Sequence, residues 1–299
     1  MHTLVREAGM KAYILTKLAV FSLLKENVFP RAAEHLDYAK RQWKHPYLRT
    51  HFRARNQCER ELILDSVGLW DEYGVEQMDF APADVILDIG AHVGMFSYMC
   101  HLRGSRAIFA YEPETTNFER LTRHLRDLEG IAILNLAVFR SDQAPTTLMH
   151  SGYLGENTGG GNVVLRGALV DIVTQELNSS APSPQRVETI ALDEILEKFE
   201  RVRLLKLDCE ASEFPILLTS QLLGRVDEII GEYHEISPQV YTMLDPAAQI
   251  EHFSEYRFEQ LVTRLEQFGF QVTVKPARPY IGKFVATRNP DFLTCHDMS

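Results

Sequence analysis

A short turn with two glycines constrains this chain more than any other feature of its sequence. The apolar run at residues 85–87 precedes Asp88, and Gly90 and Gly94 follow. This order predicts a strand that ends in a tight turn, from which a helix starts. Glycine lacks a Cβ, so the backbone can adopt positive φ and approach a ligand closely, while amides of the following helix face the same space. The pattern therefore predicts an α/β domain with a nucleotide-like ligand at this turn.

A carboxylate after the next strand supports this interpretation. Residues 106–111 have the pattern of a strand, and Glu112 follows them directly. Such a carboxylate can accept hydrogen bonds from both hydroxyls of a ribose. A dinucleotide site would have the spacing G-x-G-x-x-G, and Asp88 would repel a pyrophosphate. We therefore favour S-adenosylmethionine, which carries ammonium and sulfonium groups, over NAD; an ordinary turn with a solvated Asp88 is the remaining alternative.

Composition limits the classes of protein that the chain can belong to. Its 299 residues, 45% of them hydrophobic, are enough for one large α/β domain with an added helical segment. The net charge of −10 argues against a nucleic-acid partner, which requires clustered basic side chains. Four cysteines are widely spaced without a C-x-x-C motif, so we expect neither a zinc site nor a disulfide framework, and a cytoplasmic location. They are Cys58, Cys100, Cys209 and Cys295.

The N-terminal part of the chain has a different pattern from the rest. Residues 10–24 are apolar, but Lys17 interrupts them and they fall short of the ~20 residues that span a bilayer. We expect an amphipathic helix and no membrane span. Its apolar face could pack on the core, form a homo-oligomer or, less favourably, lie on a membrane surface. We predict a helical segment at residues 1–78, acting as an acceptor lid or oligomer contact, and a cofactor-binding domain at residues 79–299.

From Pro82 onward, strand and helix patterns alternate, which predicts a parallel sheet with helical crossovers. The expected strands are 84–89, 106–112, 131–138, 202–207 and 228–234, with a terminal antiparallel pair at 270–274 and 283–287. The expected helices are 94–103, 115–128, 192–199, 212–223 and 254–268, the second of them started by a capping box of Thr115 or Thr116 with Glu119. The glycine-rich stretch 152–161 interrupts the alternation and is an active-site loop or a flexible excursion without function.

The polar residues singled out so far all fall where predicted strands end. Asp88, Glu112, Asp208 and residues 232–234 are at carboxyl ends. In an open parallel sheet these ends meet at one edge, where ligands bind. Seven strands with a late hairpin are typical of the class I methyltransferase fold, a Rossmann-like, doubly wound sheet that is mostly parallel. We therefore predict this fold, with an N-terminal helical segment added to it.

Several motifs in this order resemble the FkbM-type methyltransferases over residues 84–235. They are the segments 88–94, 111–113 with Asn117, 157–163, 187–193, 205–210 and 232–234. The resemblance implies transfer of a methyl group from S-adenosylmethionine to a hydroxyl of a sugar, glycan or polyketide-type natural product. A NAD-dependent oxidoreductase and a non-catalytic binding protein are the two alternatives.

The resemblance also assigns residues to the cofactor. Gly90 and Gly94 would line its methionine end, Glu112 would bind the ribose, and Ala137 would border the adenine. The full expected set is Asp88, Gly90, Ala91, His92, Gly94, Glu112, Pro113, Asn117, Ala137 and Asp208. The chain departs from the family pattern at His92, where asparagine is frequent, and at Ala211-Ser212, where Gly-Ala is common. Because alanine resists positive φ, the second departure puts the turn after Asp208 in doubt.

Methyl transfer to a hydroxyl requires a positioned acceptor and a group that takes its proton. We predict His234 as the general base, because an imidazole with its ordinary pKa of about 6.5 is largely neutral at cytoplasmic pH. Asp208 is the second candidate, and a purely structural histidine is the alternative. Asp208, Glu210 and Glu232 could also bind Mg²⁺ or Ca²⁺, but we favour carboxylates that are solvated or paired with lysine, and therefore no metal.

Overall fold

The computed structural model describes residues 52, 54, 57–143, 147–150, 163 and 185–289. The predicted N-terminal helix and the glycine-rich stretch 152–161 lie outside these residues. The chain divides into two compact units between Arg53 and Ala54. The fold described below is that of the second unit.

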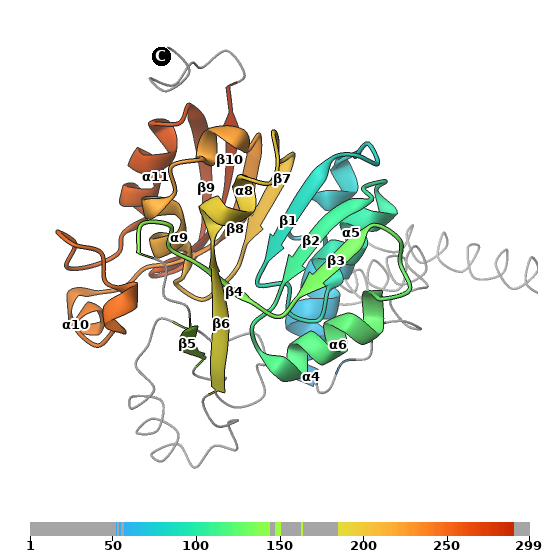
Figure 1. Ribbon diagram of the computed structural model, residues 1–299, viewed down its shortest axis with the longest axis horizontal. Helices are drawn as coiled ribbons and strands as arrows, with labels where there is room; N and C mark the ends of the chain where they lie inside the picture. Colours follow the sequence, from blue (N-terminus) through green and yellow to red (C-terminus); the bar gives the residue numbers. More distant parts are fainter. Residues whose placement is uncertain are drawn as a thin grey trace, which may run out of the picture. The chain divides into compact units, whose positions relative to one another are not determined.

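The main sheet has seven strands in the order β3-β2-β1-β7-β8-β10-β9 (Figure 1). The strands are β1 Val85–Ile89, β2 Ala107–Tyr111, β3 Ile131–Leu134, β7 Leu204–Leu207, β8 Glu228–His234, β9 Phe270–Arg278 and β10 Ile281–Arg288. Neighbours from β3 to β8 are parallel, whereas β10 is antiparallel to β8 and to β9. This arrangement confirms the predicted fold. The chain leaves β1 toward β2 and later returns to β7 on its other side, so the carboxyl ends of β1 and β7 form the switch point where such sheets bind ligands.

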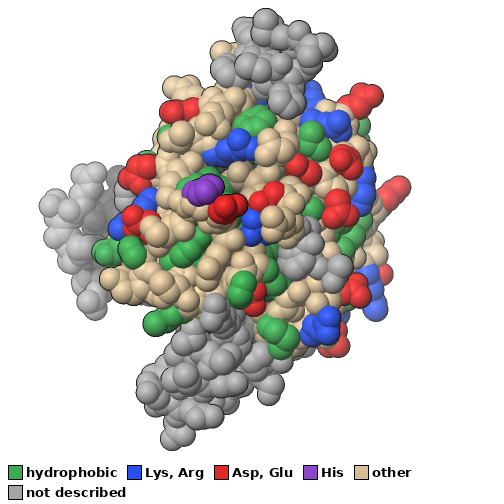
Figure 2. All heavy atoms as spheres, turned by 60° about the vertical axis from the view of Figure 1, so that its left-hand side comes forward, with side chains coloured by type: hydrophobic (Ala, Val, Ile, Leu, Met, Phe, Trp, Pro, Cys, Tyr) green, Lys and Arg blue, Asp and Glu red, His purple; other side chains and the backbone are tan. Residues whose placement is uncertain are grey.

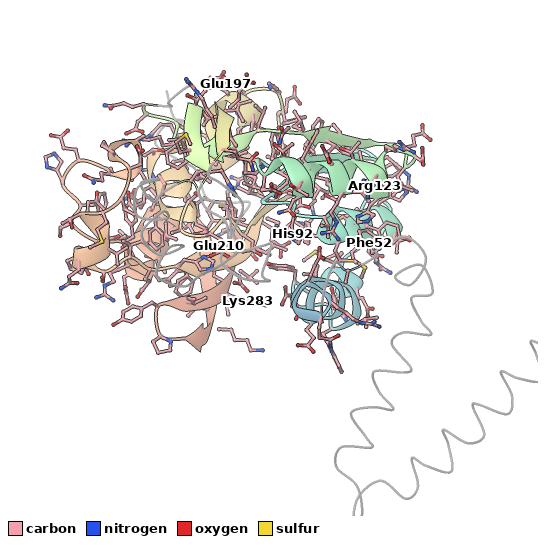
Figure 3. The ribbon with its side chains drawn as sticks, turned by 90° about the horizontal axis from the view of Figure 1, so that it is seen from below. Phe52, His92, Arg123, Glu197, Glu210 and Lys283 are labelled. Carbon is pink, nitrogen blue, oxygen red and sulfur yellow. The ribbon has the colours of Figure 1, made fainter. Side chains whose placement is uncertain are left out.

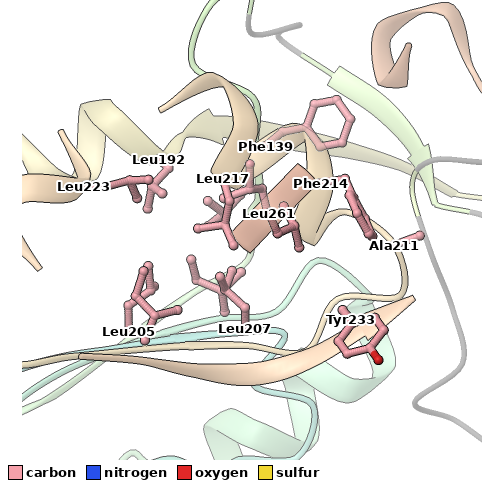
Figure 4. Close-up of a cluster of buried hydrophobic side chains, with 14 of the residues drawn as sticks. Phe139, Leu192, Leu205, Leu207, Ala211, Phe214, Leu217, Leu223, Tyr233 and Leu261 are labelled. Carbon is pink, nitrogen blue, oxygen red and sulfur yellow. The ribbon is translucent and has the colours of Figure 1, made fainter. Parts of the chain in front are cut away.

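Both faces of the central strands are covered. Leu205 and Leu207 of β7 share a hydrophobic cluster with Leu217 and Leu261 on one face (Figure 4). On the other face, α5 packs against β1 and β2. All four residues of β7 are therefore buried, as expected for a parallel strand between two helical layers.

The helices are short. Within the described residues, the α-helices are α4 Gln57–Glu59, α5 Met95–Leu102, α6 Thr115–Leu125, α8 Leu192–Leu196, α9 Glu213–Thr219, α10 Pro238–Tyr241 and α11 Phe258–Glu266. A π-helix η1 Arg60–Leu69 and 3-10 helices η2 Val75–Gln77, η3 Leu223–Arg225 and η4 Pro246–Ala248 complete them. In the part of the chain that the structure describes, no helix is both long and apolar enough to cross a membrane.

The predicted strand 131–138 is wrong in one respect, because it is two strands. β3 ends at Leu134, and the Asn135 side-chain amide donates to the backbone oxygens of Glu112 (2.8 Å) and Pro113 (3.0 Å). The chain then turns, and β4 Ala137–Phe139 joins a second sheet between β3 and the rest of the domain. That sheet has the order β4-β6-β5, with β5 Thr147–His150 and β6 Gln185–Ala191 (Figure 1).

The start of α6 also differs from the prediction. Glu114, rather than a threonine, is the N-cap. Its carboxylate accepts a hydrogen bond from the backbone amide of Asn117 at 2.6 Å. The predicted capping box with Glu119 is therefore wrong. A carboxylate at this position satisfies a free amide and also interacts favourably with the helix dipole.

Residues upstream of the sheet are part of the same unit. The Glu59 carboxylate is buried and forms an ion pair with Arg120 of α6. The π-helix η1 packs against α5. On the face drawn in Figure 2, acidic and basic side chains alternate, and hydrophobic side chains form only small separate areas.

Candidate active site

The turn after β1 has the predicted backbone conformation. Close contacts within the protein are enough to require glycine at two of its positions. Gly90 and Gly94 have φ of 75° and 93°, and His92 between them has φ of 51°. A Cβ on Gly90 would collide with the backbone oxygen of Asp208, and one on Gly94 with side chains of α6. The glycines therefore allow the loops after β1 and β7 to touch and α6 to pack closely, a role that we had assigned to ligand approach alone.

Asp88 has a different role from the one predicted. Its side chain is completely buried, accepts a hydrogen bond from the Ser97 hydroxyl at 2.7 Å, and lies 3.2 Å from the Lys206 ammonium. Lys206 in turn donates to the Gly90 backbone oxygen at 2.7 Å. Burial lowers the pKa of Lys206, but Asp88 and Asp208 raise it above its ordinary value, so the group stays charged. Asp88 therefore supports the turn through Lys206, and the predicted direct contact with a cationic ligand is not available in this conformation.

Glu112 connects the turns after β1 and β2. Its two carboxylate oxygens accept hydrogen bonds from the backbone amides of His92 and Glu114, each at 2.9 Å. Burial raises its pKa to about 7, although these two bonds act in the opposite direction. The carboxylate is therefore held rigidly and is only half ionised near neutral pH.

The other predicted cofactor residues lie in the segments around Glu112. The Ala91 amide donates to the Tyr111 backbone oxygen at 2.9 Å. Asn117 is buried in the first turn of α6, and Ala137 is buried at the start of β4. Pro113 follows Glu112, and its carbonyl is bound by Asn135.

The turn after β7 keeps its left-handed backbone without glycine. Glu210 and Ala211 have φ of 50° and 75°. Glu213 holds this turn because its carboxylate accepts a hydrogen bond from the Cys209 amide at 2.8 Å. Ala211 therefore adopts a left-handed conformation that is strained for alanine.

Three carboxylates surround His234 at the end of β8. Glu213 lies 3.5 Å from its Nδ1, while Glu210 and Glu232 lie 3.5 and 3.8 Å from its Nε2. Burial alone lowers the pKa of the imidazole, but Glu213, Glu210 and Asp208 raise it to about 10. This pKa favours a charged imidazole at neutral pH, rather than the neutral imidazole that the sequence analysis assumed.

The neighbouring carboxyls differ in charge state. Burial raises the pKa of Asp208, but Lys206, His234 and a hydrogen bond from Tyr73 together hold it below its usual value. Burial raises the pKa of Glu210 to about 7, with His234 opposing it. Asp208 is therefore held in its ionised form, whereas Glu210 is only partly ionised near neutral pH.

Two site residues were missed by the sequence analysis. The Tyr73 hydroxyl donates to Asp208 Oδ2 at 2.9 Å, and the Lys283 ammonium pairs with Glu72 and lies 3.2 Å from Glu232. Lys283 of β10 lies opposite Glu232 of β8 in the sheet register. A sequence prediction that paired β10 with β8 would therefore have indicated Lys283. Figure 3 labels His92, Glu210 and Lys283, which come from three separate segments of this site.

One group of side chains among the described residues has the spacing of a metal site. Asp208, Glu232 and His234 each offer a ligand atom, and these atoms lie within 4.8 Å of one another. Glu210, which we had considered as a ligand, is outside this group and pairs with His234 instead. Lys283 beside Glu232 already provides a positive charge there.

The sheet order is that of the class I methyltransferase fold. Residues 88–272, more than half of the chain, match the methyltransferase FkbM domain. The protein belongs to the FkbM methyltransferase family and is a methyltransferase.

Individual relatives are distant. The hexuronic acid methyltransferase AglP of Haloferax volcanii is 24% identical over 187 residues, which cover 62% of this chain and 67% of AglP. The AMB antimetabolite synthetase AmbE of Pseudomonas aeruginosa is 24% identical over 248 residues, but the matched part is only 11% of AmbE. The crystal structure of a methyltransferase FkbM from Methylobacillus flagellatus aligns with a TM-score of 0.42 at 12% identity, covering 84% of this chain and 60% of that one.

The strain at Ala211 predicts an unusual response to glycine. Relief of the left-handed conformation gains about 1–2 kcal/mol, while loss of the buried methyl costs about 0.8 kcal/mol and added chain entropy about 0.5–1 kcal/mol. Ala211→Gly should therefore change the free energy of unfolding, measured with urea, by less than about 0.8 kcal/mol in either direction. Ala110→Gly in β2, where the alanine is buried without positive φ, should lose roughly 1.5 kcal/mol. Equal losses in both variants would contradict the strain argument.

Lys283 and His234 already place positive charge among these carboxylates. We therefore predict that divalent metals do not change the stability of the protein. Addition of Mg²⁺ or Ca²⁺ to EDTA-treated protein should leave the melting temperature unchanged, as measured by calorimetry. A bound metal at about 100 times its dissociation constant would add roughly 2.7 kcal/mol and raise the melting temperature by several degrees. Such a rise, lost in Glu232→Gln, would assign a metal to Asp208, Glu232 and His234.

Proposed function

We propose that this methyltransferase uses S-adenosylmethionine and methylates a hydroxyl oxygen of a sugar-containing or polyketide-type molecule or a glycan. The observation that carries this proposal is Glu112, a buried carboxylate that two backbone amides hold at the end of β2. Its remaining acceptor capacity suits the two adjacent hydroxyls of a ribose. The relative named as a hexuronic acid methyltransferase supports an acceptor related to sugars.

The described residues fit this cofactor. Glu112 would hold the ribose, the turn from Gly90 to His92 would contact the methionine end, and Ala137 with the segment 113–117 would border the adenine. Asp88 would act indirectly by keeping Lys206 against the turn. When bound, S-adenosylmethionine supplies the electrophilic methyl carbon. The protein must then orient the acceptor hydroxyl and receive its proton.

The charge states assign the acid and base roles differently from the sequence analysis. Asp208 is ionised and can accept a proton, whereas His234 is charged and cannot. We therefore propose Asp208 as the general base. His234 would stabilise negative charge that develops on the acceptor oxygen, because a fixed cation in a partly buried site interacts more strongly than it would in water. Glu213, which is buried beside the His234 Nδ1, would keep the imidazole oriented.

The setting of this reaction is also part of the proposal. We propose a cytoplasmic enzyme that acts on a small molecule or glycan, does not bind nucleic acid and needs no divalent metal. The N-terminal segment would form an acceptor lid or an oligomer contact. Membership in the FkbM family favours these roles over the NAD-dependent oxidoreductase considered from the sequence.

The direct test has two steps. S-adenosylhomocysteine should raise the melting temperature of the protein, and NAD at the same concentration should not. Candidate sugars and glycosides are then incubated with the protein and methyl-labelled S-adenosylmethionine, and labelled products are identified by mass spectrometry. Stabilisation by NAD alone would refute the proposed cofactor. Label found only on nitrogen or carbon would refute O-methylation.

The pKa of Glu112 predicts that cofactor affinity depends on pH. The ionised carboxylate accepts from both ribose hydroxyls, so binding favours the charged form, and affinity should rise as pH passes through about 7. S-adenosylhomocysteine should bind about tenfold more weakly at pH 6 than at pH 8 by calorimetry, because at pH 6 only about one carboxyl in ten is ionised. Glu112→Gln should bind weakly at both pH values and lose the dependence. A pH dependence that survives in this variant would remove Glu112 from the ribose site.

The charge of His234 can be measured without the acceptor. The imidazole should remain protonated at pH 8 and lose its proton only near pH 10, as followed by NMR of carbon-13-labelled histidine. His234→Asn, which identifies the resonance, should lower turnover without weakening S-adenosylhomocysteine binding. An imidazole that titrates near 6.5 would restore His234 as the candidate base.

A further inference from the structure

A turn upstream of the matched family domain contributes to the site. Residues 70–74 connect η1 to η2, and the match to the FkbM domain begins only at residue 88. The Tyr73 hydroxyl nevertheless reaches Asp208 Oδ2 at 2.9 Å. The donor of this hydrogen bond therefore lies outside the matched range of residues 88–272.

The Tyr73 side chain is held in place from several sides. It is buried and meets the Phe96 ring edge to face, with centroids 5.6 Å apart and an interplanar angle of 85°. The ammonium groups of Lys206 and Lys283 lie 5.9 and 5.6 Å from the centre of its ring. Such contacts between cations and an aromatic ring are attractive, and they limit the positions that the phenol can take.

A second contact, an ion pair with a residue of β10, holds the same turn. Glu72 pairs with Lys283 of β10, and Lys283 also lies beyond residue 272, where the family match ends. Segments on both sides of the matched domain therefore meet at Asp208 and Glu232. The ion pair keeps Tyr73 and its neighbours against the sheet.

We propose that Tyr73 is a positioning residue for Asp208, supplied by a turn outside the family domain and fastened by the Glu72 and Lys283 pair. The inference deepens the proposed function and rests on Asp208 as the base. By donating to Oδ2, Tyr73 fixes the orientation of the carboxylate and favours its ionised form. The remaining acceptor capacity of Asp208 is then available to an acceptor hydroxyl.

The charge of Asp208 depends on every element packed around it. Lys206 belongs to its own strand, and Glu210 to the turn that follows. The groups that face it from other elements are His92, Glu232, His234, Lys283, Glu72 and Tyr73. Tyr73 differs from the others because it acts through a neutral hydrogen bond, so removal of its hydroxyl changes no formal charge.

The test is a titration of Asp208 in Tyr73→Phe. This substitution keeps the ring and deletes only the hydroxyl. Protein labelled with carbon-13 in the aspartate carboxyl is titrated by NMR, and the Asp208 resonance is identified by its loss in Asp208→Asn. The Asp208 midpoint should move to higher pH in Tyr73→Phe, because a hydrogen bond to the ionised form is lost. An unchanged midpoint would overturn the proposal.

A matched control separates this effect from general destabilisation. The hydroxyl of Tyr241, another buried tyrosine, donates to the Ile250 backbone oxygen and accepts from the Ile250 backbone amide, each at 2.9 Å. Tyr241→Phe also loses buried hydrogen bonds, but it should leave the Asp208 midpoint where it is in the wild type. A movement of the midpoint in both variants would show a general structural effect and would also overturn the proposal.

Activity gives a second measurement. With an acceptor from the labelling experiment, Tyr73→Phe should lower kcat about tenfold, and the acid limb of the pH profile should move in the direction of the Asp208 midpoint. S-adenosylhomocysteine affinity should stay unchanged. Failure of the wild type to bind S-adenosylhomocysteine would remove the proposed function alone, whereas normal binding with an unchanged pH limb would remove the role of Tyr73 alone.

Discussion

The site depends on one buried ion pair between adjacent strands. Asp88 and Lys206 are paired in the register of β1 and β7, and both side chains are almost completely shielded from water. Removal of two charges from water is costly, and the pair is retained only because each partner has further contacts. The Lys206 ammonium also donates a hydrogen bond to the Gly90 carbonyl and lies near the Tyr73 ring. A single ammonium therefore holds the turn after β1 and helps to keep Asp208 ionised.

The carboxylates at this edge act as a group rather than as independent residues. His234 is a cation because Glu213, Glu210 and Asp208 surround it, and Asp208 is ionised because His234 and Lys206 are close. Each charge state is thus a property of the assembled edge. This explains why a histidine with a favourable ordinary pKa is the weaker candidate for the base.

The sequence predicted the strands of the sheet better than the chemistry between them. β8 has the predicted bounds, Glu228–His234. The break at Asn135 was missed, since one polar residue in an apolar run does not reveal a side chain that binds the carbonyls of a preceding turn. Tyr73 was beyond prediction, because 135 positions separate it from Asp208 and no local pattern encodes that contact.

The position of β10 has a consequence for biosynthesis. This strand inserts between β8 and β9, although it follows both of them in the chain. While the protein emerges from the ribosome, β8 therefore has an open edge, and Glu232 lacks its ammonium partner until residue 283 has been added. The edge of the sheet that holds Glu232 is therefore completed only after β10 has been synthesised and has paired with β8.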